Sequence, residues 1–261
     1  MKFIHLSDTH LQKDEFHLYG LDPFDRLNTA IKSINKNFKD IDFIVITGDL
    51  THRGDTKAFR KLKKLVKKSK VEVILLLGNH DDRENFIKVF KDYPVNDGYI
   101  QDIRTIDNNA FIFLDTNIKN SHKGDMSDEQ FLWFEKKLKE NKDKNTYIFM
   151  HHPPMDVGIK LMDKIGFESK KGFKNLVLKY PNIKYIFFGH LHRIITGIWE
   201  DIPYFGIRGT NHQLSLKHSE TFEYTTNEEK PAYAIVEIKN KNITINVHEY
   251  LDEEKCFMIE E

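Results

Sequence analysis

The sequence has almost no cysteine and no long apolar run. Cys256 is the single cysteine among 261 residues, so an intrachain disulfide is impossible, which fits a reducing compartment. Apolar runs such as 73–77 and 186–188 have the length of strands, far below the roughly 20 residues that span a bilayer. His5 and Asp8 interrupt the apolar N-terminal stretch, which is therefore too short to be the hydrophobic segment of a signal peptide. We therefore expect a cytoplasmic protein that does not enter a membrane.

The sequence also lacks an excess of charge of either sign. Lys plus Arg and Asp plus Glu each number 40, which gives a formal net charge of zero. Proteins that coat nucleic acids or bind membrane surfaces through bulk charge carry a clear excess. The lysine-rich segments 61–70 and 136–144 have apolar residues on the opposite helix face, so we interpret them as solvated surfaces and not as a nuclease groove. A small anionic substrate remains compatible, because it needs only a local positive site.

No repeat, low-complexity tract or flexible linker divides the chain. Short apolar segments alternate with amphipathic ones, which predicts strands alternating with helices. Asp22 before Pro23 marks one helix start, and Ser127 with Gln130 forms a capping box before another. The predicted strands are 2–6, 41–47, 71–77, 110–114, 147–150, 185–188, 202–208, 233–239 and 243–250.

The strands are nearly all apolar, which indicates sheets that are covered on both faces. After residue 193 the pattern becomes rich in strands, and we predict a second sheet there instead of a separate domain. The fold class is therefore predicted as α/β, a four-layer α/β/β/α sandwich with two mixed central sheets. We expect residues 1–261 to form a single domain, with about 213–261 as a β-rich C-terminal extension or cap that contributes to the second sheet.

Side chains typical of metal sites follow the ends of five predicted strands. In sequence order these are Asp8 and His10, then Asp49, then Asn79 and His80, then His151, then His190 and His192. Ligands of open α/β sheets bind outside the carboxyl ends of the strands, where loops from distant parts of the chain meet. We therefore predict that the five loops form a single site.

The donor types predict the chemistry of this site. Imidazole and carboxylate are ligands for Fe, Mn, Zn or Co, and no thiolate is offered. A bridging carboxylate can hold two ions roughly 3.5–4 Å apart, the spacing used for phosphoryl chemistry. Glycines at positions 48, 78 and 189 would let the chain turn through positive φ beside these ligands, with ordinary turn formation as the alternative reading.

The chain contains 13 histidines, so an isolated one carries little information. We interpret six of the others as surface or core residues and not as ligands: His5, His17, His52, His122, His218 and His248.

Five motifs occur in a fixed order, each after an apolar strand: Asp-x-His, Gly-Asp, Gly-Asn-His-Asp, His-His-Pro and Gly-His-x-His. In this order they resemble the calcineurin-like metallophosphoesterase superfamily, over about residues 3–212. Segments 150–154 and 209–213 resemble more narrowly the bacterial class III cyclic nucleotide phosphodiesterases and the related glycerophosphodiesterases. The single domain expected for residues 1–261 would then be a metallophosphoesterase domain.

The resemblance implies a complete dinuclear metal site. It places one metal on Asp8, His10 and His192, the second on Asn79, His151 and His190, and Asp49 as a bridge between them. The implied cofactors are two divalent or mixed-valence transition metal ions, with Fe and Mn favoured over Zn and Co. A hydroxide bridging the metals would attack phosphorus in line with the departing alkoxide.

Four further residues have implied or expected roles around the metals. His80 resembles the family's catalytic imidazole, which stabilises phosphoryl oxygens or protonates the leaving oxygen. His212 is the second catalytic candidate, because it resembles a histidine that reaches the substrate pocket; a structural role is the alternative. Asp81 would either orient His80 or lie at the surface. His152 is expected to point away from the ligand His151 and to have a structural or supporting role.

The implied function is hydrolysis of 3′,5′-cyclic nucleotides, cyclic AMP first. A glycerophosphodiester or broad-specificity phosphodiesterase on the same site is the alternative. A nuclease, a protein phosphatase and a non-catalytic scaffold are more remote, and the complete ligand set argues against a scaffold. Segments 155–172 and 209–219 are expected to frame the pocket that decides between substrates. We expect a small-molecule phosphodiester as partner, no nucleic acid, no membrane, and a homo-oligomer as a possible assembly.

Overall fold

The computed structural model describes residues 1–14, 17–218, 220–221, 223–240 and 242–252. Cys256 lies outside these residues. Within them, no helix has the length and apolar character needed to cross a membrane.

The first sheet contains the N-terminal strand and the last two strands among the described residues. Its order is β13–β12–β1–β2–β3, in which β1, β2 and β3 are parallel, β12 is antiparallel to β1, and β13 is antiparallel to β12. The strands span Lys2–Leu6 (β1), Phe43–Ile46 (β2), Val73–Leu75 (β3), Ala232–Lys239 (β12) and Asn242–Glu249 (β13).

The second sheet has the order β4–β5–β6–β7–β9–β8, with parallel strands in its middle and antiparallel strands at both edges. Its strands span Asp102–Ile106 (β4), Asn109–Phe113 (β5), Asn145–Phe149 (β6), Ile183–Phe188 (β7), Ile195–Trp199 (β8) and Ile202–Gly206 (β9). A separate ribbon joins β10 (Gln213–Leu214) to β11 (Thr226–Asn227), with the short 3₁₀ helix η1 (Leu216–His218) between them.

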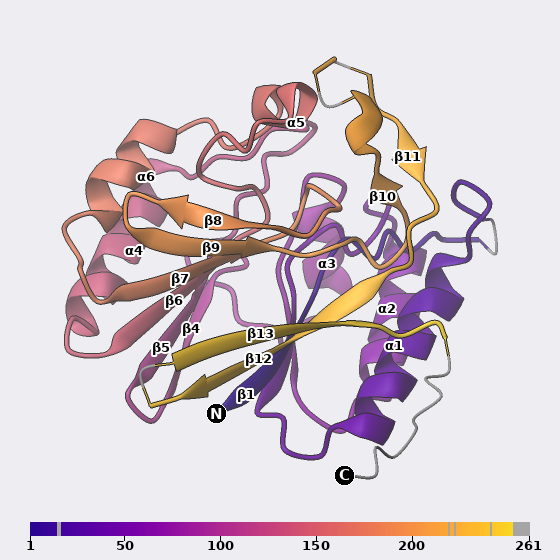
Figure 1. Cartoon of the computed structure of the whole chain (residues 1–261), viewed down its shortest axis with the longest axis horizontal. Coiled ribbons are helices and arrows are strands. Elements are labelled where there is room, and N and C mark those ends of the chain that lie inside the picture. Colours follow the sequence, from indigo (N-terminus) through magenta and orange to yellow (C-terminus); the bar gives the residue numbers. More distant parts are fainter. Residues whose placement is uncertain (15–16, 219, 222, 241, 253–261) are drawn as a thin grey trace, which may run out of the picture.

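Helices cover the outer face of each sheet. Those packed on the first sheet are α1 (Pro23–Asn37), α2 (Thr56–Val66) and α3 (Arg83–Val89). Those packed on the second are α4 (Asp128–Glu140), α5 (Lys160–Lys164) and α6 (Lys170–Val177). Figure 1 shows α1 and α2 on one side of the molecule and α4 and α6 on the other, with the sheets between them.

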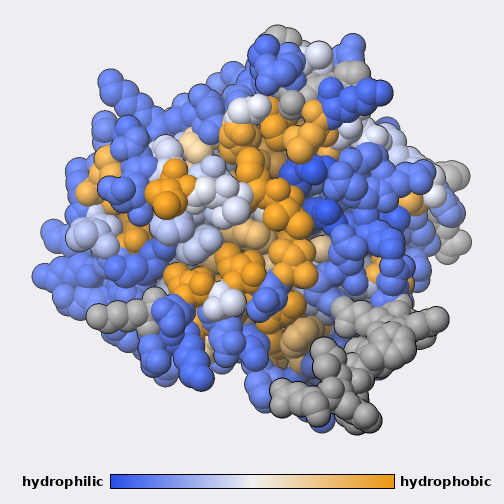
Figure 2. All heavy atoms as spheres, viewed as in Figure 1, coloured by the Kyte–Doolittle hydropathy of each residue, from blue (hydrophilic) through white to orange (hydrophobic). Residues whose placement is uncertain are grey.

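The inner faces of the two sheets share an aromatic core. Phe3 of β1 stacks on Phe43 at a ring-centroid distance of 5.0 Å and meets Phe149 and Phe187 of the other sheet edge to face, at 5.5 and 5.4 Å. Figure 2 shows apolar side chains reaching the surface between β8–β9 and β12–β13. Partly buried Ile243 and Ile245 of β13 pack against the shared core. The central strands β2 and β5 are buried on both faces, so their apolar runs are nearly continuous, whereas the edge strands β4, β8 and β13 are partly exposed. The predicted four-layer sandwich with two mixed sheets is confirmed.

The predicted helix starts are also confirmed. The Asp22 carboxylate accepts the backbone N–H groups of Phe24 and Asp25 at 2.9 and 3.1 Å, and Pro23 occupies the first turn. Ser127 and Gln130 form the reciprocal capping box of α4. Both devices satisfy N–H groups that a helix cannot pair internally.

The strands after residue 193 join both sheets. β8 and β9 extend the second sheet, whereas β12 pairs with β1 in the register Lys2↔Glu237 to His5↔Ala234. This pairing occupies the edge of β1 that β2 leaves free, so the two ends of the described chain are tied together in the first sheet.

A buried histidine in β1 predicts how stability responds to acid. His5 is fully buried, contacts Thr47 Oγ1 through Nε2 at 2.8 Å, and meets Phe187 and Phe205 edge to face. Burial lowers the pKa of His5 from 6.5 to about 3, so between these pH values the unfolded chain binds a proton at His5 and the folded chain does not. The titration of His5 therefore leaves the free energy of unfolding unchanged above pH 6.5. Below it, the free energy falls by about 1.36 kcal/mol per pH unit, which amounts to about 2 kcal/mol at pH 5.

We therefore expect His5→Phe to lose less stability than wild type when the pH is lowered from 6.5 to 5, by about 2 kcal/mol. Urea unfolding of both proteins in EDTA measures the difference, because the other histidines titrate equally in both and cancel. Thr47 keeps a hydrogen bond to the Leu6 carbonyl in the variant. Equal pH dependence of the two proteins would contradict the prediction.

Candidate metal centre

The strand-end residues predicted from the sequence lie together at one edge of the two sheets. Asp8, His10, Asp49 and His192 form a buried group in which one donor atom of each lies within 4.8 Å of the others. They follow β1, β2 and β7, which belong to different sheets. Hydrogen bonds between loops hold this edge together, including those from the N–H groups of Asp8 and His10 to the carbonyls of Gly48 and Asp49.

Two donor clusters meet at Asp49. In the first, His192 Nε2 lies 3.1 Å from His10 Nε2 and 3.4 Å from Asp8 Oδ1. Asp49 Oδ2 lies 3.6 Å from His10 Nε2.

In the second cluster, Asn79 Oδ1 lies 3.2 Å from His151 Nε2 and 3.0 Å from His190 Nδ1. The same Asp49 Oδ2 lies 3.5 Å from His151 Nε2. One carboxylate oxygen is therefore shared by the two clusters, and all seven residues predicted as ligands are brought together.

Backbone carbonyls fix the tautomers of two of these imidazoles. His151 Nδ1 lies 2.7 Å from the Thr47 carbonyl, and His192 Nδ1 lies 2.7 Å from the His212 carbonyl. A carbonyl only accepts, so each Nδ1 carries the hydrogen. The lone pair of each neutral ring is then on Nε2, which faces the cluster, as in histidines that bind metals.

The arrangement fits metal ions. Donor atoms bound about 2.1 Å from one ion lie about 3.0–3.5 Å apart in tetrahedral or octahedral geometry, which matches the spacings above. Asp8 Oδ2 is buried and has no hydrogen-bond partner among the described residues. A buried polar atom without a partner is costly, and a cation at the cluster would satisfy it.

The charges of the cluster depend on one another. Burial lowers the pKa of His10 and His190 well below the usual range. Burial also opposes the charge of His151, but the Asp49 carboxylate outweighs it and raises the pKa of His151 to about 9. Burial likewise opposes the charge of Asp49, yet His151 holds the pKa of this carboxyl well below its ordinary value. Asp49 thus requires a positive neighbour, which a proton on His151 or a metal cation can supply.

The backbone of the cluster is strained. Five of the seven residues have left-handed backbone conformations: Asp8 (φ 54), His10 (φ 46), Asp49 (φ 48), His190 (φ 67) and His192 (φ 49). A residue with a Cβ pays about 1–2 kcal/mol for this conformation. Strain of this kind is concentrated at functional sites, because surrounding structure enforces it to aim particular side chains.

Two of the three glycines beside the predicted ligands serve a different purpose from the one predicted. Gly48 does have a positive φ of 97, and a Cβ there would lie 2.5 Å from His151 Nδ1. Gly78 and Gly189 do not have positive φ, so that prediction is wrong for them. A Cβ on Gly78 would collide with Asp49 Oδ1, and one on Gly189 would collide with Ser7 Oγ. These two glycines provide space for neighbouring loops.

His80 lies at the rim of the cluster. Its backbone N–H donates to Asp49 Oδ1 at 2.9 Å, and its ring Nδ1 donates to the His52 carbonyl at 2.9 Å. The ring centroid lies 4.9 Å from that of His10. Nε2 is therefore the ring nitrogen that the His52 carbonyl does not engage.

Asp81 is buried, so its interpretation as a surface residue is wrong. Its carboxylate accepts the N–H groups of Leu50 and Thr51, both at 2.9 Å, that of Gly78 at 3.0 Å, and the Thr51 hydroxyl at 2.8 Å. These bonds join the loop after β2 to the loop after β3. Asp81 thereby holds the loops that carry Asp49 and Asn79 in register, and both of its carboxylate oxygens accept these bonds.

His152 does not point away from the site, contrary to the prediction. Its ring centroid lies 4.5 Å from that of His190, and its Nδ1 contacts Thr116 Oγ1 at 2.8 Å. Gly124 leaves room for this ring, since a Cβ there would collide with it. His152 therefore packs against His151 and His190, and its structural or supporting role stays a prediction.

His212 lies against the first cluster. It is 2% exposed, and its ring centroid is 4.3 Å from that of His192. Its Nε2 contacts the Tyr224 hydroxyl at 3.0 Å. Burial, together with the neighbouring histidines, lowers its pKa to about 2, so the ring is neutral.

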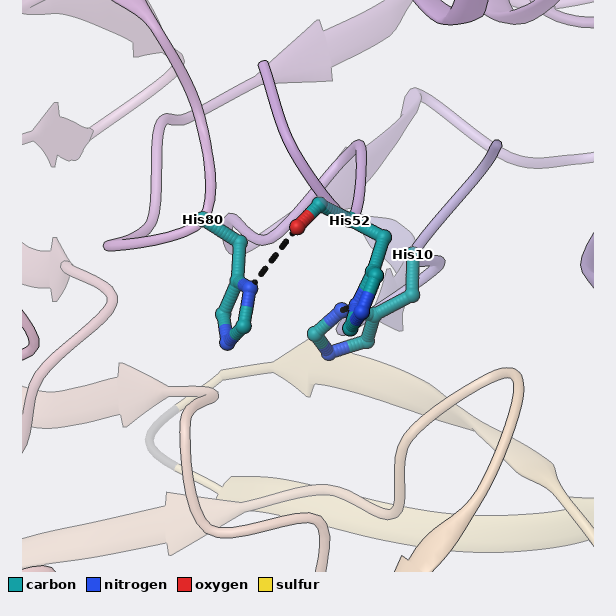
Figure 3. A group of neighbouring side chains, drawn as sticks. All are labelled: His10, His52 and His80. Carbon is teal, nitrogen blue, oxygen red and sulfur yellow. Dashed lines mark hydrogen bonds between the residues drawn. The ribbon is translucent and has the colours of Figure 1, made fainter. Parts of the chain in front are cut away.

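Two histidines that sequence reasoning set aside also line the site. His52 stacks on His80 with ring centroids 5.1 Å apart and an interplanar angle of 17°, and His122 Nδ1 lies 3.4 Å from Asn79 Nδ2. Figure 3 shows His10, His52 and His80 side by side. The sequence position of His52 could have indicated its place at the site, because His52 comes three residues after Asp49 in the same loop.

A pocket of about 290 Å³ opens above the two clusters. Its floor carries the histidines, Asp49 and Asn79, whereas an apolar wall is formed by Tyr19, Leu161, Met162, Ile165 and Tyr224. Segments 155–172 and 209–219 were predicted to frame this pocket, and they contribute four of its lining residues: Leu161, Met162, Ile165 and His212.

The four-layer fold and a cluster of imidazole and carboxylate donors at the strand ends define a metallophosphoesterase. A model of the calcineurin-like phosphoesterase family matches residues 1–193, so the chain belongs to this family. The resemblance inferred from the motifs is thereby confirmed. The fold of this family implies a dinuclear metal centre.

Relatives and solved structures agree with this assignment. The chain is 34% identical over 250 residues to a probable cyclic nucleotide phosphodiesterase of Rhodopseudomonas palustris, covering 94% of this chain and 91% of the relative. It is 30% identical to a probable glycerophosphodiester phosphodiesterase of Arcobacter nitrofigilis, covering 83% and 81%. A dimetal phosphatase from Danio rerio has the same fold, with a TM-score of 0.72, 13% identity and 96% of each chain covered. The protein is a metal-dependent phosphodiesterase.

Proposed function

We propose that this phosphodiesterase hydrolyses 3′,5′-cyclic nucleotides, with cyclic AMP as the preferred substrate. The observation that carries the proposal is the pair of donor clusters sharing Asp49 at the floor of a pocket with an apolar wall. The similarity to a probable cyclic nucleotide phosphodiesterase over 94% of the chain supports the substrate class.

The proposed metal ligands follow the two clusters. One ion binds Asp8, His10 and His192, the other binds Asn79, His151 and His190, and Asp49 binds both. Two such cations supply Lewis acidity to the phosphoryl oxygens and lower the pKa of a bound water toward neutrality. The donor set accepts Fe, Mn, Zn or Co, with Fe and Mn proposed as the native ions.

His80 is proposed as the catalytic imidazole. The His52 carbonyl holds its Nδ1–H, so Nε2 is available to bind a phosphoryl oxygen or, when protonated, to give a proton to the leaving oxygen. His212 is proposed to support the site from beside the ligands, because its carbonyl orients His192 and its ring contacts Tyr224.

The apolar wall favours a substrate with a large flat group. A nucleobase has two apolar faces, which can pack on Leu161, Met162 and Ile165 or against the ring of Tyr19. A glycerol group has no such face. The ester bond of a cyclic nucleotide would then lie over the donor clusters while its base lies on the wall.

A glycerophosphodiester is the second candidate. The relative from Arcobacter nitrofigilis supports it. Tyr19 and Tyr224 also line the pocket, and aromatic rings of this kind bind quaternary ammonium groups such as choline.

A substrate panel distinguishes the two candidates. Protein reconstituted with Mn²⁺ is given cyclic AMP, cyclic GMP, glycerophosphocholine and a phosphomonoester, and kcat/KM is compared. We expect cyclic AMP to exceed glycerophosphocholine by at least about 10-fold, because burial of a base on the apolar wall is worth more than about 1.4 kcal/mol. A preference for glycerophosphocholine would replace the first candidate with the second. EDTA-treated protein is the control and should be inactive.

We further propose a cytoplasmic location, a small-molecule phosphodiester as the partner, and residues 1–261 as one functional domain. Whether the chain forms a homo-oligomer is decided by light scattering of the purified protein.

A further inference from the structure

We propose that His52 is a positioning residue that holds His10 in the tautomer needed to bind a metal ion through Nε2. The inference rests on the proposed function, because it takes His10 as a ligand. It assigns a role to a residue that belongs to none of the metal-binding motifs.

Three imidazoles of the site are oriented by backbone carbonyls. His151, His192 and His80 donate Nδ1–H to the carbonyls of Thr47, His212 and His52, at 2.7, 2.7 and 2.9 Å. Each carbonyl can only accept, so in each neutral ring Nε2 carries the lone pair. Side-chain substitutions leave these carbonyls in place.

His10 differs, because its Nδ1 faces a side chain. Its Nε2 lies 3.1 Å from His192 Nε2 and 3.6 Å from Asp49 Oδ2, so this is the atom directed at the donor cluster. Its Nδ1 lies 3.4 Å from His52 Nδ1. For Nε2 to bind a metal, Nδ1 must carry the hydrogen, and His52 Nδ1 is the acceptor that receives it. His52 then carries its own hydrogen on Nε2.

The fold holds His52 where this bond requires it. The backbone N–H of His52 donates to the Leu11 carbonyl at 3.0 Å, and Leu11 directly follows His10. The preceding residue, Thr51, donates hydrogen bonds from its backbone N–H and its hydroxyl to the buried carboxylate of Asp81. The loop that carries His52 is therefore tied to the loop that carries His10.

His52 also stacks on His80, so a test must separate the stacking from the hydrogen bond. His52→Phe keeps a flat ring against His80 but has no acceptor for His10. His52→Asn loses the ring but places its amide oxygen where His52 Nδ1 now lies. Both variants keep the backbone carbonyl that binds His80. His52 is only half-buried, which lets the loop accept either side chain.

The experiment is a calorimetric titration, in which Mn²⁺ is added to protein from which EDTA has removed the metal. Loss of an orienting partner weakens metal binding about 10–100-fold. We expect His52→Phe to weaken the binding of one of the two Mn²⁺ ions by this factor. The affinity for the other ion should stay within about threefold of wild type. His52→Asn should bind both ions within about threefold of wild type. Thermal unfolding in EDTA checks that each variant is folded.

Two outcomes would overturn the proposal. In the first, His52→Phe binds both ions as tightly as wild type. In the second, His52→Asn weakens metal binding as much as His52→Phe does. The second would mean that the ring, and not the acceptor, matters. Wild-type protein that binds no Mn²⁺ would overturn the proposed metal centre and this role together. Wild-type protein that binds two ions but does not hydrolyse cyclic nucleotides would overturn only the substrate assignment.

Discussion

Replacing Asp49 with asparagine is expected to remove metal and activity together. Asp49 Oδ2 lies 3.6 and 3.5 Å from the Nε2 atoms of His10 and His151, so one oxygen serves both clusters. Asparagine has the same shape and can still accept the His80 N–H, but it carries no negative charge. A neutral amide is a poor bridge between two cations, and their Lewis acidity is worth several kcal/mol in such reactions.

We expect Asp49→Asn to lose at least one of two Mn²⁺ ions and to lower kcat by about 10³-fold or more, since about 4 kcal/mol corresponds to that factor. Elemental analysis and turnover of cyclic AMP on the same sample measure both effects. Asp143→Asn is the matched control, because Asp143 is exposed and lies outside the site. Retention of two tightly bound ions in Asp49→Asn would show that Asp49 does not bridge them.

Replacing His80 with alanine is expected to separate activity from metal content. The His80 side chain contributes no donor atom to the two clusters around Asp49, and its backbone N–H, which bonds Asp49 Oδ1, survives the change. The ring Nε2 is what the variant loses. We expect kcat to fall by about 10²-fold or more, the scale of lost acid–base help, while both ions remain bound.

The result for His80→Ala is read from kcat and elemental analysis together. Turnover equal to that of wild type would remove His80 from the mechanism. Loss of metal in step with activity would instead make His80 part of the metal site, and the imidazole proposed for proton transfer would have to be sought elsewhere in the pocket.

Much of the site was predictable because the donors stand directly after strands. Parallel strands that share a direction place their carboxyl ends at one edge, so Asp8, Asp49 and Asn79 had to meet once β1, β2 and β3 formed one sheet. Helix starts were predictable for a similar reason, since Asp22 and Ser127 cap N–H groups only two or three residues away.

Contacts between loops were not predictable from such local patterns. Asp81 reads as a polar residue after a turn, yet it bonds Leu50 and Thr51 across 30 residues or more. His52 reads as an isolated histidine, yet it lies against His10 and His80. Nothing in either local sequence specifies which loop will lie opposite.

The sequence by itself determined nine of the strands, the layered α/β class and the identity of the donors, because periodicity, capping and strand ends act over a few residues. It did not predict β4, β8, α3, α5 or α6. Only the tertiary structure decided which sheet receives the last hairpin, which glycines give space instead of positive φ, and which side chains orient the donors. It also imposed left-handed backbone on five of the seven predicted ligands. Those features depend on contacts between segments far apart in the chain, whose packing energy offsets the local cost.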